Sequence, residues 1–159
     1  MIHYRNDVRG SGVDGRRLKM LARKLLVAAG ESGSTLSLWL VDDAAIAELN
    51  RRHRDKRGPT DVLSFPLEPE APSVSLLDDG SVPPERLLGD VVISVETARR
   101  QAAVYDADLD AELTRLLIHG LLHILGHDHE RPGERALMVA QEQRLAAAIG
   151  MAWPYEQER

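Results

Sequence analysis

A chain of 159 residues can enclose one hydrophobic core of ordinary size, so we expect a single domain over residues 1–159. Hydrophobic residues make up 43% of the chain and charged residues 28%, which excludes an intrinsically disordered protein, and the absence of cysteine excludes disulfide bonds and thiolate metal ligands. The net charge of −5 combines an excess of basic residues over residues 1–57 with a larger excess of acidic residues over residues 58–159. Phosphates respond to the local electrostatic potential, so the negative net charge does not exclude a nucleic-acid partner.

The first ten residues are polar and charged and lack the apolar core of a secretory signal. No apolar run in the chain approaches the ~18 residues that a membrane-spanning helix needs. We therefore expect a cytoplasmic protein that does not associate with a membrane.

Hydrophobic periodicity and capping residues predict an alternation of strands and helices. In chain order, we expect a strand at residues 2–5, a helix at 14–29, a strand at 35–41, a helix from a cap at 42–43 to about 52, strands at 61–65 and 90–95, and helices at 97–104, 108–125 and 134–149. These elements predict an α/β (α+β) domain, in which a small mixed sheet of about four strands is layered with about five helices.

A long loop is predicted between two of these strands. Residues 68–84 carry four of the eight prolines, together with acidic and small residues. Proline interrupts both helices and the ladders of a sheet, so this composition is typical of a loop without secondary structure of its own.

The helix at 108–125 ends in a cluster of histidines. From Leu116 onward this helix is apolar on nearly every side, so we expect it to be buried. Four of the six histidines fall in the segment at 118–130, IHGLLHILGHDHE. His119 and His123 are four residues apart, so on a helix their Cβ atoms lie about 5–6 Å apart on one face, where both imidazoles can bind one ion.

A third ligand requires the helix to end. His129 is six residues beyond His123 and, at ~100° per residue, would point away from the pair if the helix continued. Gly126 can adopt the left-handed conformation that ends a helix and lets the chain bring His129 back. Three imidazoles and an open position for water are typical of a catalytic zinc site, and the same ligands can take Ni²⁺ or Mn²⁺. His127 can compete as a ligand, although alternate residues diverge on a tight turn, and Asp128 is a candidate to orient a ligand or the bound water.

The alternative is that these are core histidines that bond to backbone carbonyls, the ordinary role of a lone histidine on an apolar helix. Three imidazoles buried around a glycine without a shared partner would leave much of their hydrogen-bonding capacity unmet. We therefore expect a metal site.

The spacing of histidine and glycine over residues 119–129 resembles that of the metzincin proteases, but Gly120 occupies the position of their general-base glutamate. With Gly120 included, HGLLHILGHDH resembles the signature of the YbeY family of bacterial zinc-dependent endoribonucleases. Two upstream blocks, LNRRHRDKRGPTDVLSFP and LLGDVVIS, resemble that family's other motifs, so the resemblance covers about residues 40–142. Arg57 departs from it, because we expect an aspartate there.

The resemblance implies a zincin-like fold with a central metal-bearing helix, one Zn²⁺ per chain bound by the three histidines, and Arg54 facing the metal across a cleft as the phosphate-binding residue. The residues themselves agree, because the segment at 51–57, RRHRDKR, holds five Lys and Arg, and a guanidinium can bind a phosphate through two hydrogen bonds. A run of charges is more often only a solvated face, and this alternative stays open.

The implied function is endonucleolytic cleavage of single-stranded RNA in rRNA maturation, at the 3′ end of 16S rRNA, and in ribosome quality control. The implied partners are rRNA or the small ribosomal subunit, with ribosomal proteins or an assembly GTPase. In this mechanism zinc polarises a phosphoryl oxygen or lowers the pKa of bound water, and Arg54 stabilises charge in the transition state.

Several alternatives stay open. The general base is metal-bound hydroxide, Asp128 or the substrate's 2′-hydroxyl. A metallopeptidase with the same three-histidine site, and a non-enzymatic ribosome assembly factor stabilised by zinc, are the other functions that the sequence allows. Met138, downstream of the histidines, is either a hydrophobic floor below the metal or a core residue.

Overall fold

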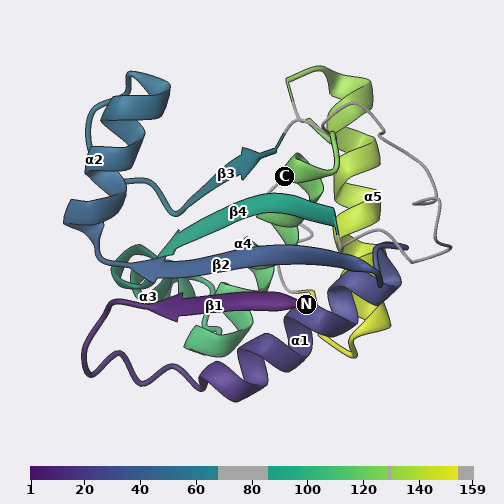
Figure 1. Ribbon diagram of the computed structural model, residues 1–159, viewed down its shortest axis with the longest axis horizontal. Helices are drawn as coiled ribbons and strands as arrows, with labels where there is room; N and C mark the ends of the chain where they lie inside the picture. The colour runs from purple at the N-terminus through teal and green to yellow at the C-terminus, as the bar shows by residue number, and fades with distance from the viewer. Residues whose placement is uncertain (68–85, 129, 154–159) are drawn as a thin grey trace, which may run out of the picture.

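Four strands form one mixed sheet in the computed structural model (Figure 1), which describes residues 1–67, 86–128 and 130–153. The strands lie in the order β1-β2-β4-β3. Their bounds are β1 (Ile2–Asn6), β2 (Ser34–Val41), β3 (Val62–Pro66) and β4 (Arg86–Ser94). β1, β2 and β4 run parallel, whereas β3 runs antiparallel to β4 and forms one edge of the sheet. This mixed sheet confirms the expected α/β class.

Five helices accompany the sheet in the described part of the chain: α1 (Gly15–Ala28), α2 (Asp43–Arg54), α3 (Val95–Val104), α4 (Leu109–Ile124) and α5 (Pro132–Ala148). The central helix is α4, which packs against β3 and β4 and contacts α1, α3 and α5 (Figure 1). It begins where Asp108 accepts a hydrogen bond from the backbone N–H of Ala111, as the sequence predicts. Among the described helices none is both long and apolar enough to cross a bilayer.

The observed elements differ from the predicted ones mainly at their ends. β4 begins at Arg86, four residues before the predicted start, because its first residues pair with the beginning of β2, and such a distant pairing leaves no local signal. α3 begins at Val95, which the sequence pattern places in the strand. α5 begins at Pro132, since proline suits the first turn of a helix. The predicted loop at 68–84 lies outside the described residues.

The main core lies between the sheet and helices α1, α3, α4 and α5, and a glycine in α4 sets the separation of that helix from the sheet. The large side chains that α4 buries with at most 1% exposure are Leu113, Leu116, Leu117, Ile118 and Leu121. At Gly120 a Cβ atom would lie 2.8 Å from Cγ1 of Val91 and 3.1 Å from Oγ of Ser64. The Ser64 hydroxyl donates a 2.9 Å hydrogen bond to the carbonyl oxygen of Gly120. The absent side chain therefore lets α4 approach both strands closely.

Replacing Gly120 by alanine is expected to lower the free energy of unfolding by about 1–3 kcal/mol, because overpacking against buried Val91 outweighs the higher helix propensity of alanine. Urea denaturation of the two proteins measures the difference. Gly133→Ala is the matched control, since Gly133 also lies in a helix and a Cβ atom there has nothing within 4 Å. An unchanged unfolding midpoint for Gly120→Ala would contradict the close packing.

Candidate functional site

His119 and His123 lie one turn apart near the end of α4, and their rings face each other. Their Nε2 atoms are 3.1 Å apart, and the rings meet edge to face with centroids 4.7 Å apart and an interplanar angle of 76°. Two nitrogens bound at about 2.0–2.1 Å to one tetrahedral ion lie about 3.3–3.4 Å apart. The pair therefore fits two ligand positions around one metal ion.

Gly126 ends the histidine-bearing helix, as the sequence predicts. Its φ is +98°, in the region that favours glycine. Its N–H donates to the carbonyl of His123 at 3.0 Å, and the N–H of His127 donates to the carbonyl of Leu122 at 2.9 Å. These two bonds form a Schellman motif, which turns the chain sharply out of the helix.

The predicted third ligand, His129, lies outside the described residues, so its place in the ligand set stays a prediction. Within residues 1–67, 86–128 and 130–153, no group of three histidine or carboxylate side chains is arranged to hold a metal ion. Asp128 is half-buried, two residues beyond Gly126, and its role as an orienting group or base also stays a prediction.

A buried carboxylate that sequence reasoning missed lies behind the histidine pair. Oε2 of Glu142, in α5, is 3.5 Å from Nδ1 of His119, and Glu142 is fully buried. Histidines that bind metal through one ring nitrogen commonly have a carboxylate at the other. The signal that could have identified Glu142 is its position four residues after Met138, because residues at this spacing share one face of a helix, and Met138 is buried.

Arg54, the last residue of α2, reaches the edge strand. Its Nη2 donates a 2.8 Å hydrogen bond to the carbonyl oxygen of Ser64 in β3. The hydroxyl of the same Ser64 bonds to Gly120, the neighbour of His119. Ser64 therefore links the predicted phosphate-binding residue to the turn of α4 that carries the histidines.

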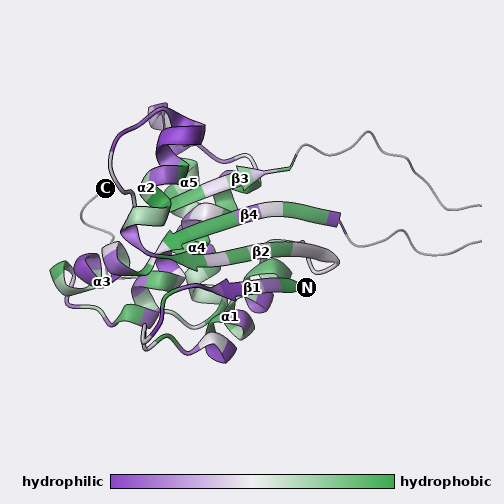
Figure 2. Cartoon of the chain, turned by 60° about the vertical axis from the view of Figure 1, so that its left-hand side comes forward, coloured by the Kyte–Doolittle hydropathy of each residue, from purple (hydrophilic) through white to green (hydrophobic). Residues whose placement is uncertain are grey.

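The cationic run at 51–57 is divided between two roles. Arg51 and Arg52 contact Glu48 within the helix, at 2.7 and 3.8 Å. The hydrogen bond between Arg51 and Glu48 lowers the pKa of the carboxyl and raises that of the guanidinium. Figure 2 shows the hydrophilic end of α2 standing away from the sheet. The solvated-face interpretation therefore holds for Arg51 and Arg52, whereas Arg54 turns toward β3.

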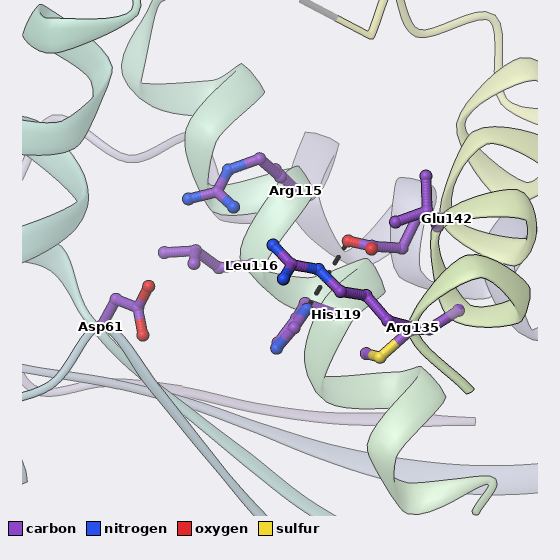
Figure 3. A pocket seen from close by; sticks show the side chains of 8 residues that line it. Asp61, Arg115, Leu116, His119, Arg135 and Glu142 are labelled. Carbon is purple, nitrogen blue, oxygen red and sulfur yellow. Dashed lines mark ion pairs between the residues drawn. The ribbon is translucent and has the colours of Figure 1, made fainter. Parts of the chain in front are cut away.

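A cavity of about 310 Å³ opens beside His119 (Figure 3). It is lined by α4, α5 and the residue that precedes β3, and its charged lining residues are Asp61, Arg115, Arg135 and Glu142. Met138 is 1% exposed and also lines the cavity, so it is both a core residue and part of the wall beside His119.

The chain resembles proteins of one family. A family model described as Endoribonuclease YbeY matches residues 4–150. The Endoribonuclease YbeY of Moorella thermoacetica is 45% identical over 139 residues, which cover 84% of this chain and 87% of that protein. The Endoribonuclease YbeY of Myxococcus xanthus is 50% identical over 143 residues. These residues cover 89% of this chain but 46% of that protein, so the chain spans about half of its length. A structure solved in solution, TM1509 from Thermotoga maritima, matches with a TM-score of 0.61 and 25% identity, covering 94% of this chain and 89% of that one.

Proposed function

Because this chain belongs to the endoribonuclease YbeY family, we propose that it is a zinc-dependent enzyme that cleaves single-stranded RNA. The observation that carries the proposal is the pair of Nε2 atoms of His119 and His123, 3.1 Å apart in a helix that borders the cavity. The finer proposal rests on the resemblance alone: maturation of the 16S rRNA 3′ end and ribosome quality control in the cytoplasm, with the small subunit, ribosomal proteins or an assembly GTPase as partners.

In this proposal His119, His123 and His129 hold the metal ion. When bound, Zn²⁺ supplies a Lewis acid that polarises a phosphoryl oxygen or lowers the pKa of a water. Ni²⁺ or Mn²⁺ can take the same nitrogen ligands. Glu142 would accept a hydrogen bond from Nδ1–H of His119, which fixes the tautomer whose Nε2 lone pair faces the ligand position.

Arg54 would bind the phosphate that is cleaved. The carbonyl oxygen of Ser64 accepts a hydrogen bond from one guanidinium N–H of Arg54, and this bond fixes the direction of the arginine side chain. Arginine has five such donors, so others remain to bond phosphate oxygens. The guanidinium charge would then stabilise the negative charge that grows in the transition state.

The packing of Gly120 supports RNA over a peptide as the substrate. This position carries the general-base glutamate in metzincin proteases, but here it faces Val91 and Ser64 so closely that a longer side chain would displace α4 from the sheet. Because no glutamate stands at this position, the candidates for the general base are an activated water, Asp128 and the substrate's 2′-hydroxyl.

Removing either described imidazole is expected to abolish both metal binding and RNA cleavage. His119→Ala and His123→Ala should each retain well below one zinc per chain by elemental analysis, with cleavage of a labelled single-stranded RNA reduced about 100-fold or more. Circular dichroism checks that the variants are folded. Undiminished cleavage by a variant verified to be free of metal would refute the mechanism.

Arg54→Ala is expected to keep zinc but to lower kcat about 100-fold, because the transition-state charge loses its cationic partner. Arg51→Ala is the control, since Arg51 lies on the same helix but pairs with Glu48. Single-turnover cleavage of the same RNA by the two variants measures the difference. Equal rates would show that the cationic run acts only as a solvated helix face.

Glu142→Ala is expected to weaken zinc binding about 10–100-fold, because the imidazole of His119 loses the carboxylate that orients it. Glu142→Gln should weaken zinc binding less than Glu142→Ala does, since the amide oxygen of glutamine still accepts a hydrogen bond. Competition with a chromophoric chelator measures the affinity. Glu112→Gln is the control, because Glu112 is equally buried but bonds to Arg115, and its zinc affinity should match that of the unaltered protein. An unchanged affinity for Glu142→Ala would remove Glu142 from the site.

A further inference from the structure

Two polar residues that line the cavity beside His119, Asp61 and Arg115, belong to one hydrogen-bond network. Arg115 bonds to the fully buried Glu112 through Nε and Nη2 and to the side-chain oxygen of Gln101 at 3.3 Å. The amide nitrogen of the same Gln101 donates to Oδ2 of Asp61 at 3.3 Å. Gln101 therefore ties Asp61 to Arg115, and the charge of Arg115 is balanced by Glu112.

Arg135 differs from Arg115, although both line the cavity. Arg135 is exposed, and within the described residues its side chain makes no hydrogen bond or ion pair. Figure 3 shows its side chain extending from α5 across the cavity toward Arg115 and His119. The carboxylate of Glu142, on the same helix as Arg135, is paired with His119. Arg135 is thus a cation with its donors available to a ligand.

Asp61 supplies the opposite chemistry on the other wall. Its Oδ1 accepts from the N–H of Val62 at 2.8 Å and from the hydroxyl of Thr60 at 3.4 Å. With the bond from Gln101 this makes three hydrogen bonds, whereas a carboxylate offers about four acceptor sites. A fixed carboxylate with acceptor capacity left is the group that binds ribose hydroxyls in dinucleotide-binding domains.

We propose that the cavity is a ribonucleotide subsite, in which Arg135 binds a phosphate and Asp61 accepts a hydrogen bond from the 2′-hydroxyl of a nucleotide next to the cleaved bond. The inference rests on the proposed function. A site for phosphate alone would gain nothing from a carboxylate, whereas a ribonucleotide presents both an anion and a hydroxyl donor. The volume of about 310 Å³ lies at the small end of ligand sites and admits one nucleotide withdrawn from its stack, but not a duplex.

The phosphate contact is tested by Arg135→Ala, assayed with zinc-loaded protein on a labelled single-stranded RNA. KM is expected to rise about tenfold with kcat little changed, since a charge-assisted contact to a remote phosphate is lost. The dependence of KM on salt should become less steep for this variant. Arg131→Ala is the control, because Arg131 is exposed beside the start of the same helix. Equal KM values for the two variants would overturn the assignment of Arg135.

The hydroxyl contact is tested with RNA oligomers that carry one 2′-deoxy nucleotide, placed in turn at positions other than the cleaved one. At one flanking position the substitution is expected to raise KM several-fold for the unaltered protein, and to have no effect for Asp61→Ala. Asp61→Asn, which keeps the acceptor oxygen, should restore the sensitivity. If Asp61→Ala keeps the same sensitivity, the subsite is refuted. If the unaltered protein cleaves no RNA, the proposed function itself fails, so the two failures are distinguishable.

Discussion

The close approach of α4 to the sheet at Gly120 is the contact on which the whole site depends. With no side chain at this position, the helix lies against Val91 of β4, and the hydroxyl of Ser64 in β3 reaches the carbonyl oxygen of Gly120. One residue earlier in the helix is His119, and Arg54 bonds to the backbone of the same Ser64. A single point of helix–sheet packing thus fixes the imidazole and the guanidinium relative to each other. A wider separation would disconnect them without changing any of the functional residues.

Local rules account for the parts of this arrangement that the sequence reveals. The four-residue spacing of His119 and His123 and the helix-ending role of Gly126 follow from helix geometry and from the conformational preference of glycine, and the described residues confirm both. The strands and helices were predictable for the same reason, apart from their ends. The early start of β4 depends on pairing with β2 and has no local signal.

Contacts between distant segments account for what the sequence hides. Glu142 comes from a helix that follows the histidines, and only the packing of α5 on α4 shows that it meets His119, whereas proximity in sequence favours Asp128. From the sequence, Gly120 is notable only because it replaces a catalytic glutamate. In the structure it lets α4 pack closely against the sheet. The cationic run at 51–57 divides into intrahelical pairs and one arginine that turns to β3, because Glu48 lies one turn before Arg51 and Arg52.

The packing of α4 also bears on what the proposed metal does. Small domains that need a structural zinc fold only when it binds, because their own core is too small. Here the histidine-bearing helix is held by leucines buried among the sheet and the neighbouring helices, and by the hydrogen bonds that end the helix at Gly126. This packing holds the turn of α4 that carries the two imidazoles, and Oε2 of Glu142, from a second helix, lies 3.5 Å from Nδ1 of His119. A preorganised pair of ligands beside a cavity suits an ion that keeps one position open for a reactant, so the packing favours a catalytic role for the metal over a structural one.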